Sequence, residues 1–189
     1  MIKTAFITAA AILGAGIQAN AFPFTVKTTE NGNFIHWPRG KTAIFYAVGE
    51  AIPAPRPRSI RALARAFENW EEEAGNIRFI YTGLTSPALA AQDGVNSVNW
   101  INNEWRHGEE IVAISTTWYD HLTGAIEEVD IEFNARDYSW FSEDSPGIQE
   151  TALHEIGHLL GIDHSFNPKA VMHGEIGPNR PVVRKLSRD

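Results

Sequence analysis

The residues best suited to chemistry lie close together near the carboxyl end of the chain. His154, Glu155 and His158 form a His-Glu-x-x-His sequence, and Gly161 and His164 follow at short offsets. Two imidazoles at positions i and i+4 lie one turn apart on the same side of a helix. From there both can reach one zinc ion at about 2.0–2.1 Å. The spacing therefore predicts a metal site built on a helix.

The helix that must carry these side chains is predicted to begin at Ser145-Pro146, with serine as the N-cap and proline in the first turn. At about 100° per residue, six apolar side chains fall within an arc of about 140°. These side chains are Ile148, Ala152, Leu153, Ile156, Leu159 and Leu160. His154 and His158 fall on the other side, at about 240° and 280°. One side of the helix is thus predicted to enter the core, and the other to present the imidazoles.

Gly161 is predicted to end this helix, since glycine readily takes the positive φ found just beyond many helices. The chain can then turn back, so that His164 supplies a third ligand. Three protein ligands leave the fourth position of a tetrahedral zinc ion open for water, as in catalytic sites. Glu155 lies about 60° around the helix from His158, beside the metal. It could take a proton from a water activated by the zinc and pass it to a leaving amine.

The composition limits the alternatives. The chain has no cysteine, which excludes a disulfide framework and a thiolate metal site, whereas it has seven histidines. Its formal net charge of −7 would repel a phosphate backbone, so nucleic acid is not an expected partner. With 189 residues, 43% of them hydrophobic, the chain fits one folded domain.

The first residues have the three parts of a secretory signal peptide. Lys3 gives a positive start, residues 5–17 are almost wholly apolar, and Ala19-Asn20-Ala21 resembles a cleavage site. A short buried helix or a membrane anchor is the alternative, but spanning a bilayer takes about 20 apolar residues. We therefore predict a signal peptide over residues 1–21 and an exported, soluble domain over residues 22–189, either extracellular or periplasmic.

The elements expected between these two regions indicate an α+β domain with one mixed sheet. Strands are predicted over residues 41–48, 76–81, 95–101, 110–116 and 126–133. The last two would be joined by a hairpin through Thr123-Gly124. A first helix is predicted from Ser59, as its N-cap, to Gly75. Its helical spacing is set by Ile60, Leu63, Ala64, Phe67 and Trp70.

The motif over residues 154–164 resembles the signature of the metzincins, a family of zinc peptidases. Metzincins also carry a methionine turn beneath the zinc, and Met172 follows the motif at a suitable distance. Ser165, directly after the third histidine, makes the site similar to the matrixin branch, the matrix-metalloproteinase-like peptidases. A weaker resemblance extends upstream from Phe133 to Trp37-Pro38.

This resemblance implies a metzincin-like catalytic domain with a twisted, mixed, five-stranded sheet, two long helices and a methionine turn. It implies an exported endopeptidase that acts on proteins or peptides with one catalytic zinc. His154, His158 and His164 would hold the zinc, and Glu155 would be the general base. We expect such a protein to be a monomer, with no membrane contact once the signal peptide is removed.

The resemblance also implies that residues 110–116 form an upper edge strand, on which the substrate lies extended and adds to the sheet. Val112, Ala113 and Ile114 would then line the cleft. An ordinary core strand explains the same residues equally well. Matrixins continue into a C-terminal helix, and Ser187 resembles its N-cap, so we expect the chain to be truncated at this end.

The sequence departs from the matrixin pattern in several places. Without a cysteine, latency through a propeptide cysteine is not expected. His107 and His121 lie near the positions of structural-zinc ligands, but Asp130 stands where a later histidine would be, so no structural zinc is expected. Glu128, Asp130 and Glu132 alternate with apolar residues, which predicts a solvated acidic face. Calcium bound by this face, together with Asp137, is the alternative. His173 replaces a tyrosine that is frequent in the family and is not expected to be a ligand.

Two other functions fit the same residues. The chain could be a zinc hydrolase of a non-protein amide, for example in a cell wall. It could also be a zinc-binding module that has kept its ligands and lost turnover. The presence of Glu155 argues against the inactive module, whereas the short C-terminal tail argues for it.

Overall fold

The structure, a computed structural model, describes residues 5–9, 25–53, 56–140, 147–174 and 186. In this part of the chain the elements are β1 (Ala5–Ala9), β2 (Ala43–Gly49), α1 (Arg56–Ala74), β3 (Arg78–Thr85), β4 (Ser97–Ile101), β5 (Ala113–Tyr119), β6 (Ile126–Asn134) and α2 (Ile148–Leu159). The α+β class predicted from the sequence is confirmed, with its five strands and two helices. A further strand, β1, comes from residues within the predicted signal peptide, and that prediction remains untested.

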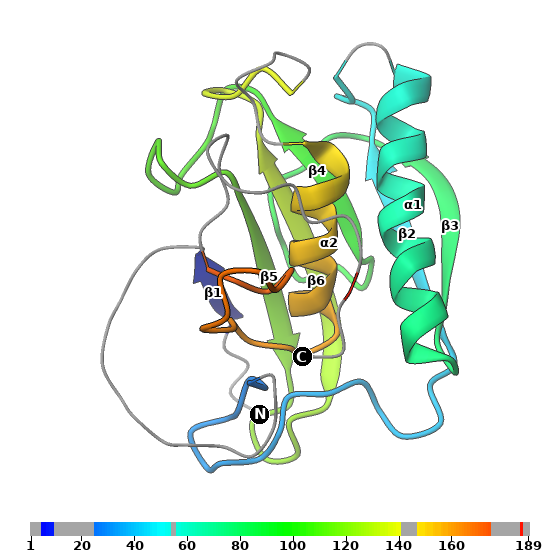
Figure 1. The fold of residues 1–189 in the computed structure, drawn as a ribbon, viewed down its shortest axis with the longest axis vertical. Coiled ribbons are helices and arrows are strands. Elements are labelled where there is room, and N and C mark those ends of the chain that lie inside the picture. Colours follow the sequence, from blue (N-terminus) through cyan, green and yellow to red (C-terminus); the bar gives the residue numbers. More distant parts are fainter. Residues whose placement is uncertain (1–4, 10–24, 54–55, 141–146, 175–185, 187–189) are drawn as a thin grey trace.

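The strands form one mixed sheet in the order β1-β5-β6-β4-β2-β3 (Figure 1). β2 is parallel to both β3 and β4, and β4 is parallel to β6. β5 is antiparallel to β6, as the predicted hairpin requires, and β1 is antiparallel to β5. The turn between β5 and β6 contains Gly124, which has a φ of 78°. The sheet topology thus places β5 and β6 together at the side of the sheet where α2 lies.

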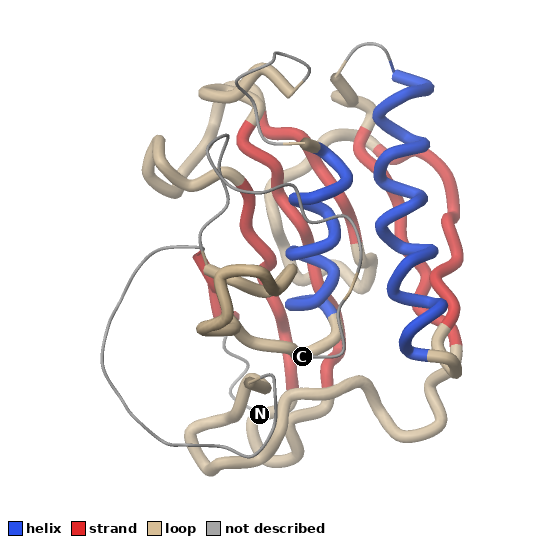
Figure 2. Tube along the Cα trace, in the orientation of Figure 1, coloured by secondary structure: helices blue, strands red, loops and turns tan. Residues whose placement is uncertain are grey.

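Both helices lie on the same face of the sheet, with α2 in front of β5 and β6 and α1 in front of β2 and β3 (Figure 2). The indole nitrogen of Trp70 in α1 donates a hydrogen bond of 2.8 Å to the carbonyl of Leu153 in α2. The apolar sides of both helices enter a common core with Phe133 and Trp100 of the sheet. Neither described helix has the length and apolar character needed to cross a lipid bilayer.

The helix starts differ from those predicted. α1 begins at Arg56, so Ser59 lies inside the helix rather than at its N-cap, and its hydroxyl donates a hydrogen bond of 2.7 Å to the carbonyl of Pro53. α1 ends at Ala74, before Gly75, as predicted. α2 begins at Ile148 with Gly147 as N-cap, and no side chain caps it. The predicted start at Ser145-Pro146 lies outside the described residues.

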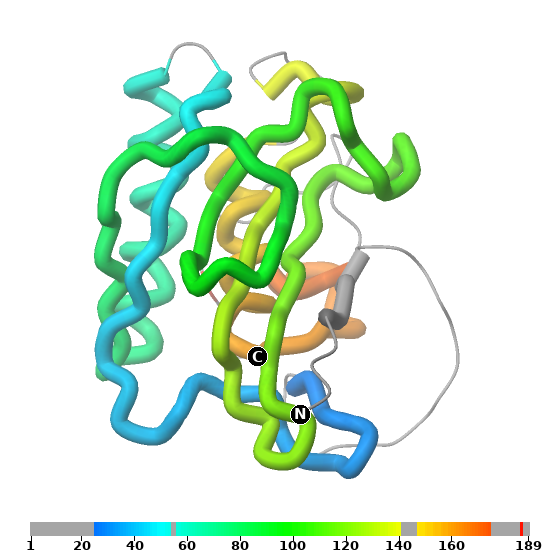
Figure 3. The backbone as a smooth tube through the Cα atoms, turned by 180° about the vertical axis from the view of Figure 1, so that it is seen from behind, coloured from blue at the N-terminus to red at the C-terminus, as the bar shows by residue number. Residues whose placement is uncertain are grey.

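The acidic residues of β6 are not solvated, so that prediction is wrong. Glu128, Asp130 and Glu132 are 2%, 3% and 3% exposed, because the loop over residues 86–96 covers this face of the sheet, opposite the helices (Figure 3). Main-chain N–H groups of the loop and of the start of β4 donate hydrogen bonds of 2.7–3.1 Å to these carboxylates. The donors belong to Ala90, Ala91, Asp93, Gly94 and Ser97.

Each of the three carboxylates accepts hydrogen bonds from protein N–H groups, so these buried polar groups have partners. Asp137, the further oxygen ligand considered above, is instead paired with Arg136 at 2.8 Å and accepts a hydrogen bond from Asn134. His107 lies 3.4 Å from the carboxylate of Glu132.

Candidate metal centre

The carboxyl end of α2 is shaped by Gly161, which has a φ of 89°. The N–H of Gly161 donates to the carbonyl of His158, and the N–H of Ile162 donates to the carbonyl of Gly157, each at 3.0 Å. This pair of bonds is the Schellman arrangement, in which a residue with positive φ ends the helix. A Cβ atom at position 161 would collide with the carbonyl oxygen of Ile35. Only glycine therefore fits at this turn, which redirects the chain as the sequence predicts.

The turn brings His164 back to the two histidines of the helix. Nε2 of His158 lies 3.1 Å from Nε2 of His154 and 3.1 Å from Nε2 of His164. His154 and His158 are each 1% exposed, and His164 is half-buried. Among the described residues, these three are the group whose ligand atoms could hold a metal ion. In a tetrahedral zinc site with bonds of about 2.0–2.1 Å, neighbouring ligand atoms are about 3.3 Å apart, which is close to the distances found here.

Main-chain carbonyls orient two of the imidazoles. Nδ1 of His154 lies 2.9 Å from the carbonyl of Val171, and Nδ1 of His158 lies 2.8 Å from the carbonyl of Ile162. A carbonyl can only accept, so Nδ1 carries the proton in both rings and Nε2 presents a lone pair. Two lone pairs 3.1 Å apart repel each other unless they share a cation. The donor set of three imidazoles is one that zinc prefers, so these residues fit a zinc ion.

Burial keeps His158 and His164 in the neutral form that binds metals. Removal from water lowers the pKa of His158 well below its ordinary value, and the neighbouring charge of Lys27 lowers it further. Burial also lowers the pKa of His164, against the opposing effect of Asp163. Because neutral imidazole is the ligand form, the site is ready for a metal near neutral pH.

Glu155 lies in the same helix and is 1% exposed. Its Oε2 accepts a hydrogen bond of 2.7 Å from the hydroxyl of Ser115, a residue of β5. Burial raises the pKa of Glu155 to about 7, although the hydrogen bond from Ser115 lowers it. The carboxyl group is thus able to exchange a proton near neutral pH, as a general base must. Sequence reasoning missed Ser115, because the local motif gives no sign of a contact between residues 40 positions apart.

Met172 lies beneath this end of α2 and is 5% exposed. A Cβ atom at Gly157, between the two helical histidines, would collide with the sulfur of Met172. The carbonyl of Met172 accepts a hydrogen bond of 2.7 Å from the N–H of Ser165, directly after the third histidine. Met172 is therefore packed against α2 at Gly157, and its carbonyl is joined to the residue that follows His164. His173 is not in the histidine group, and its Nδ1 lies 3.2 Å from the carbonyl of Ser165.

The residues expected to line a substrate cleft lie at the start of β5. Val112 precedes the strand, Ala113 and Ile114 begin it, and all three are buried. β1 pairs with the outer side of β5 in antiparallel register, from Ala5 opposite Trp118 to Ala9 opposite Ile114. The outer backbone of β5 can therefore take up an extended chain, and here that chain is an N-terminal part of the protein itself.

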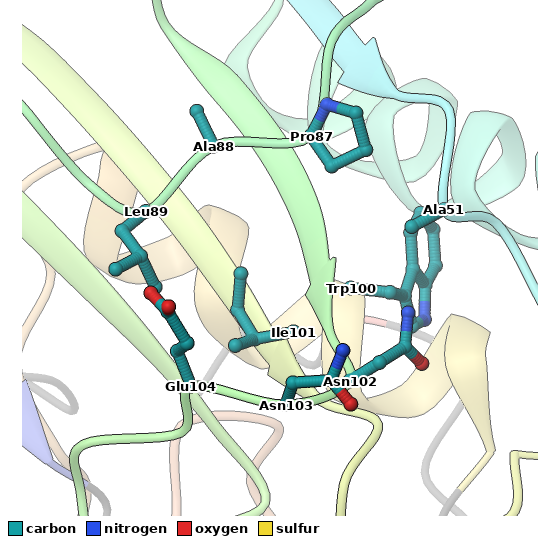
Figure 4. Close-up of a pocket in the computed structure, with 9 residues that line it drawn as sticks. All are labelled: Ala51, Pro87, Ala88, Leu89, Trp100, Ile101, Asn102, Asn103 and Glu104. Atoms are coloured by element: carbon teal, nitrogen blue, oxygen red, sulfur yellow. The ribbon is translucent and has the colours of Figure 1, made fainter.

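A separate cavity lies at the carboxyl end of β4, away from the histidines. It is lined by Trp100 and Ile101, by the loop after β4, by Ala51, and by residues 87–89 (Figure 4). None of the residues that the sequence predicts to act in the site lines it, so the metal site and this cavity are distinct.

Comparison with known proteins agrees with this geometry. A family model described as Matrixin (Peptidase_M10) matches residues 36–189. Human matrilysin (Homo sapiens) is 44% identical to the chain over 55 residues, which make up 28% of this chain and 21% of matrilysin. The matched segment thus spans about a fifth of the length of that relative.

Proposed function

Because the chain belongs to the matrixin family of metallopeptidases, we propose that it is a zinc-dependent endopeptidase. Its substrates are internal peptide bonds of proteins or peptides. His154, His158 and His164 hold a single zinc ion, Glu155 is the general base, and Met172 forms the methionine turn.

The observation that carries this proposal is the facing pair of Nε2 atoms of His154 and His158, 3.1 Å apart. Both rings are held in the tautomer that points a lone pair inward, so a shared cation is the stable way to fill the space between them. The third imidazole, from His164, completes a set that leaves one position for water and substrate.

The chemistry requires a base beside the metal. Zinc, when bound, supplies Lewis acidity that activates water and polarises the scissile carbonyl. Glu155 takes the proton of the attacking water and delivers it to the leaving amine nitrogen. The hydroxyl of Ser115 fixes one carboxylate oxygen, at 2.7 Å, so that Glu155 is held in one orientation. Burial of Glu155 excludes bulk water from this proton transfer.

The substrate is proposed to bind as an extended chain along β5, with Val112, Ala113 and Ile114 along the cleft. Pairing of β1 with β5 supports this mode, since it uses the backbone groups that a peptide would use. In this proposal residues 1–21 are removed as a signal peptide on export. The mature protein then acts as a monomer outside the cytoplasm and leaves the outer side of β5 open to substrate.

The test is cleavage of a peptide library by the purified mature chain, with and without a chelator. We expect cleavage within peptides that the chelator abolishes and added zinc restores. Glu155→Ala should keep one zinc per chain and lose turnover by about 10²- to 10⁴-fold. Turnover that survives in Glu155→Ala would refute the assigned base. Hydrolysis confined to amide-linked glycans in a parallel panel would favour a non-protein substrate instead.

A further inference from the structure

The cavity at the carboxyl end of β4 has no part in the proposed chemistry. Its volume is about 520 Å³, which lies within the range of about 300–1,000 Å³ that is usual for small-molecule sites. Its lining comes from three segments: residue 51 after β2, residues 87–89 after β3, and residues 100–104 at the end of β4 and beyond. The cavity is therefore a second concave site, built by parts of the chain that the metal centre does not use.

The sheet topology favours a ligand site at this place. β2 and β4 are parallel neighbours, and the chain leaves them in opposite directions. From β2 it passes through α1 to β3 on one side, and from β4 it passes to β5 and β6 on the other side. Where connections diverge in this way, a crevice opens beyond the carboxyl ends of the strands, and ligands bind there in many open sheets. The cavity occupies this crevice, since Ala51 lies just after β2, and Trp100 and Ile101 end β4.

Trp100 differs from four other tryptophans in the hydrogen bonding of its indole N–H. Its residue is 1% exposed, and the buried Nε1 has no acceptor in the part of the chain that the structure describes. The ring is stacked on Phe133, with 5.0 Å between the ring centroids, so this side of the ring offers no acceptor. Main-chain carbonyls accept the indole N–H groups of the other four at 2.8–3.1 Å: Trp37, Trp70, Trp105 and Trp140. A buried donor calls for an acceptor, and a ligand in the cavity that Trp100 lines can supply it.

The rest of the lining limits the chemistry of the ligand. Asn102 and Asn103 lie along the lower edge of the cavity in Figure 4, and Glu104 lies on the side opposite Trp100. A carboxamide both donates and accepts hydrogen bonds, and a carboxylate accepts them, which suits hydroxyl groups. The charge of Glu104 disfavours an anion. The remaining lining is apolar and comes from Ala51, Pro87, Ala88, Leu89 and Ile101.

We propose that this cavity binds a neutral sugar that carries an acetamido group. The acetamido carbonyl accepts the hydrogen bond of the Trp100 indole, because a carbonyl brings no proton that would need a second buried partner, whereas a hydroxyl does. The acetyl methyl group packs against Leu89 and Ile101, and the ring hydroxyls bond to Asn102 and Glu104 at the exposed edge. This site goes beyond the proposed peptidase function and does not depend on it.

The test is binding of N-acetylglucosamine to the purified chain, followed through the indole N–H resonances in NMR spectra. The chain has six tryptophans, and Trp100→Phe identifies the Trp100 signal by its loss. We expect this signal to move and to saturate with an apparent Kd of about 1 mM or below. The signals of Trp37 and Trp70, whose N–H groups already have acceptors, should stay in place. Glucose, which lacks the acetamido group, should bind about tenfold more weakly.

Variants at the exposed edge test the site without a change in the core. Asn102→Ala and Glu104→Ala each remove an exposed polar group that lines the cavity, and each should weaken binding about tenfold. Glu109→Ala is the matched control, because Glu109 is also exposed and follows β4 but does not line the cavity. It should bind the sugar as the wild type does. Should Trp100→Phe fail to fold, through-bond spectra of the wild type assign the Trp100 signal and the edge variants decide.

A Trp100 signal that does not respond to N-acetylglucosamine would overturn the proposal and leave water as the acceptor. Equal binding of glucose would overturn recognition of the acetamido group. Binding that a chelator abolishes would belong to the metal centre and would also count against this site. A chain that binds the sugar but cleaves no peptide would refute the proposed function while the sugar site stands, so the two failures are distinguishable.

Discussion

Gly161 lies directly against the backbone of Ile35, so closely that its Cα has no room for a side chain. This contact joins the segment before β2 to the turn after α2, and Gly161 combines it with a φ of 89°. The position of His164 depends on that turn, since the chain could not double back toward His154 and His158 without it.

Gly161→Ala should therefore destabilise the fold and weaken metal binding together. A left-handed backbone with a Cβ, in addition to the collision with Ile35, should cost about 1–3 kcal/mol in the free energy of unfolding. Denaturant unfolding measures the first effect, and competition with a chelator measures zinc affinity. Gly75→Ala is the matched control, because Gly75 also has a positive φ but open space around it. It should lose about 1 kcal/mol and keep full zinc affinity. Equal zinc affinity in both variants would show that the turn does not place His164.

The hydroxyl of Ser115 should matter for turnover but not for metal binding. Ser115→Ala removes the hydrogen bond to Glu155 and should lower kcat about tenfold, the effect of about 1.4 kcal/mol. Thr117 lies two residues along the same strand, is 1% exposed, and its hydroxyl has no partner among the described residues. Thr117→Val is therefore a control that should leave kcat unchanged. The prediction fails if both variants behave alike, or if Ser115→Ala loses its zinc.

Asp130 should make stability depend on pH. Burial raises its pKa from 3.8 to about 7, despite hydrogen bonds from Ser97 and Ala91 that lower it. Between these two values the folded chain holds a proton that the unfolded chain has released. The contribution of Asp130 to the free energy of unfolding is therefore fully present below pH 3.8, and it is lost as the pH rises through 7.

The free energy of unfolding should therefore fall between pH 5 and 7 by up to about 1.4 kcal/mol per pH unit from this residue alone. In Asp130→Asn the fall in the free energy of unfolding over this pH range should be smaller by the contribution of Asp130, while the contribution of Glu155, whose pKa burial also raises to about 7, remains. Asp137→Asn serves as the control, since the hydrogen bond from Arg136 lowers the pKa of Asp137 and moves its titration out of this range. Urea unfolding at several pH values gives the comparison, and an identical slope in wild type and Asp130→Asn would exclude the assignment.

Acid should release the zinc, because protons compete for the three imidazoles. The pKa values of His158 and His164 are lowered by burial, so release should begin below the ordinary histidine value of about 6.5. Zinc retained after dialysis at graded pH, measured by atomic absorption, would give the midpoint. We expect little zinc at about pH 4, and an undiminished content there would contradict imidazole ligation.

The sequence predicted the helices and strands well, because the spacing of apolar residues and the glycines and prolines between segments indicate the same elements. Each predicted strand and helix is present, with ends displaced by a few residues. The start of α1 was misplaced because Ser59 has the side chain of an N-cap, whereas its hydroxyl in fact bonds to the carbonyl of Pro53 from within the helix. A serine hydroxyl can cap a helix or bond to another nearby backbone group. Residue types alone therefore do not predict at which residue such a helix begins.

Contacts between distant parts of the chain were beyond the sequence. The alternation of Glu128, Asp130 and Glu132 with apolar residues showed which face of β6 they share, but not that a loop covers them. The same limit applies to Ser115, whose hydroxyl donates a hydrogen bond to Glu155 from another segment of the chain. The spacing of the three histidines, in contrast, was informative because one helix and one turn bring all of them together.

The loop over residues 86–96 is bonded to β6 through main-chain N–H groups, which every residue except proline has. The loop over residues 86–96 can therefore exchange most of its side chains without loosening, provided that positions 90, 91, 93 and 94 keep their amides. The outward-facing side chains of this loop could therefore be substituted, in evolution or by design, while its backbone stays bonded to the carboxylates of β6.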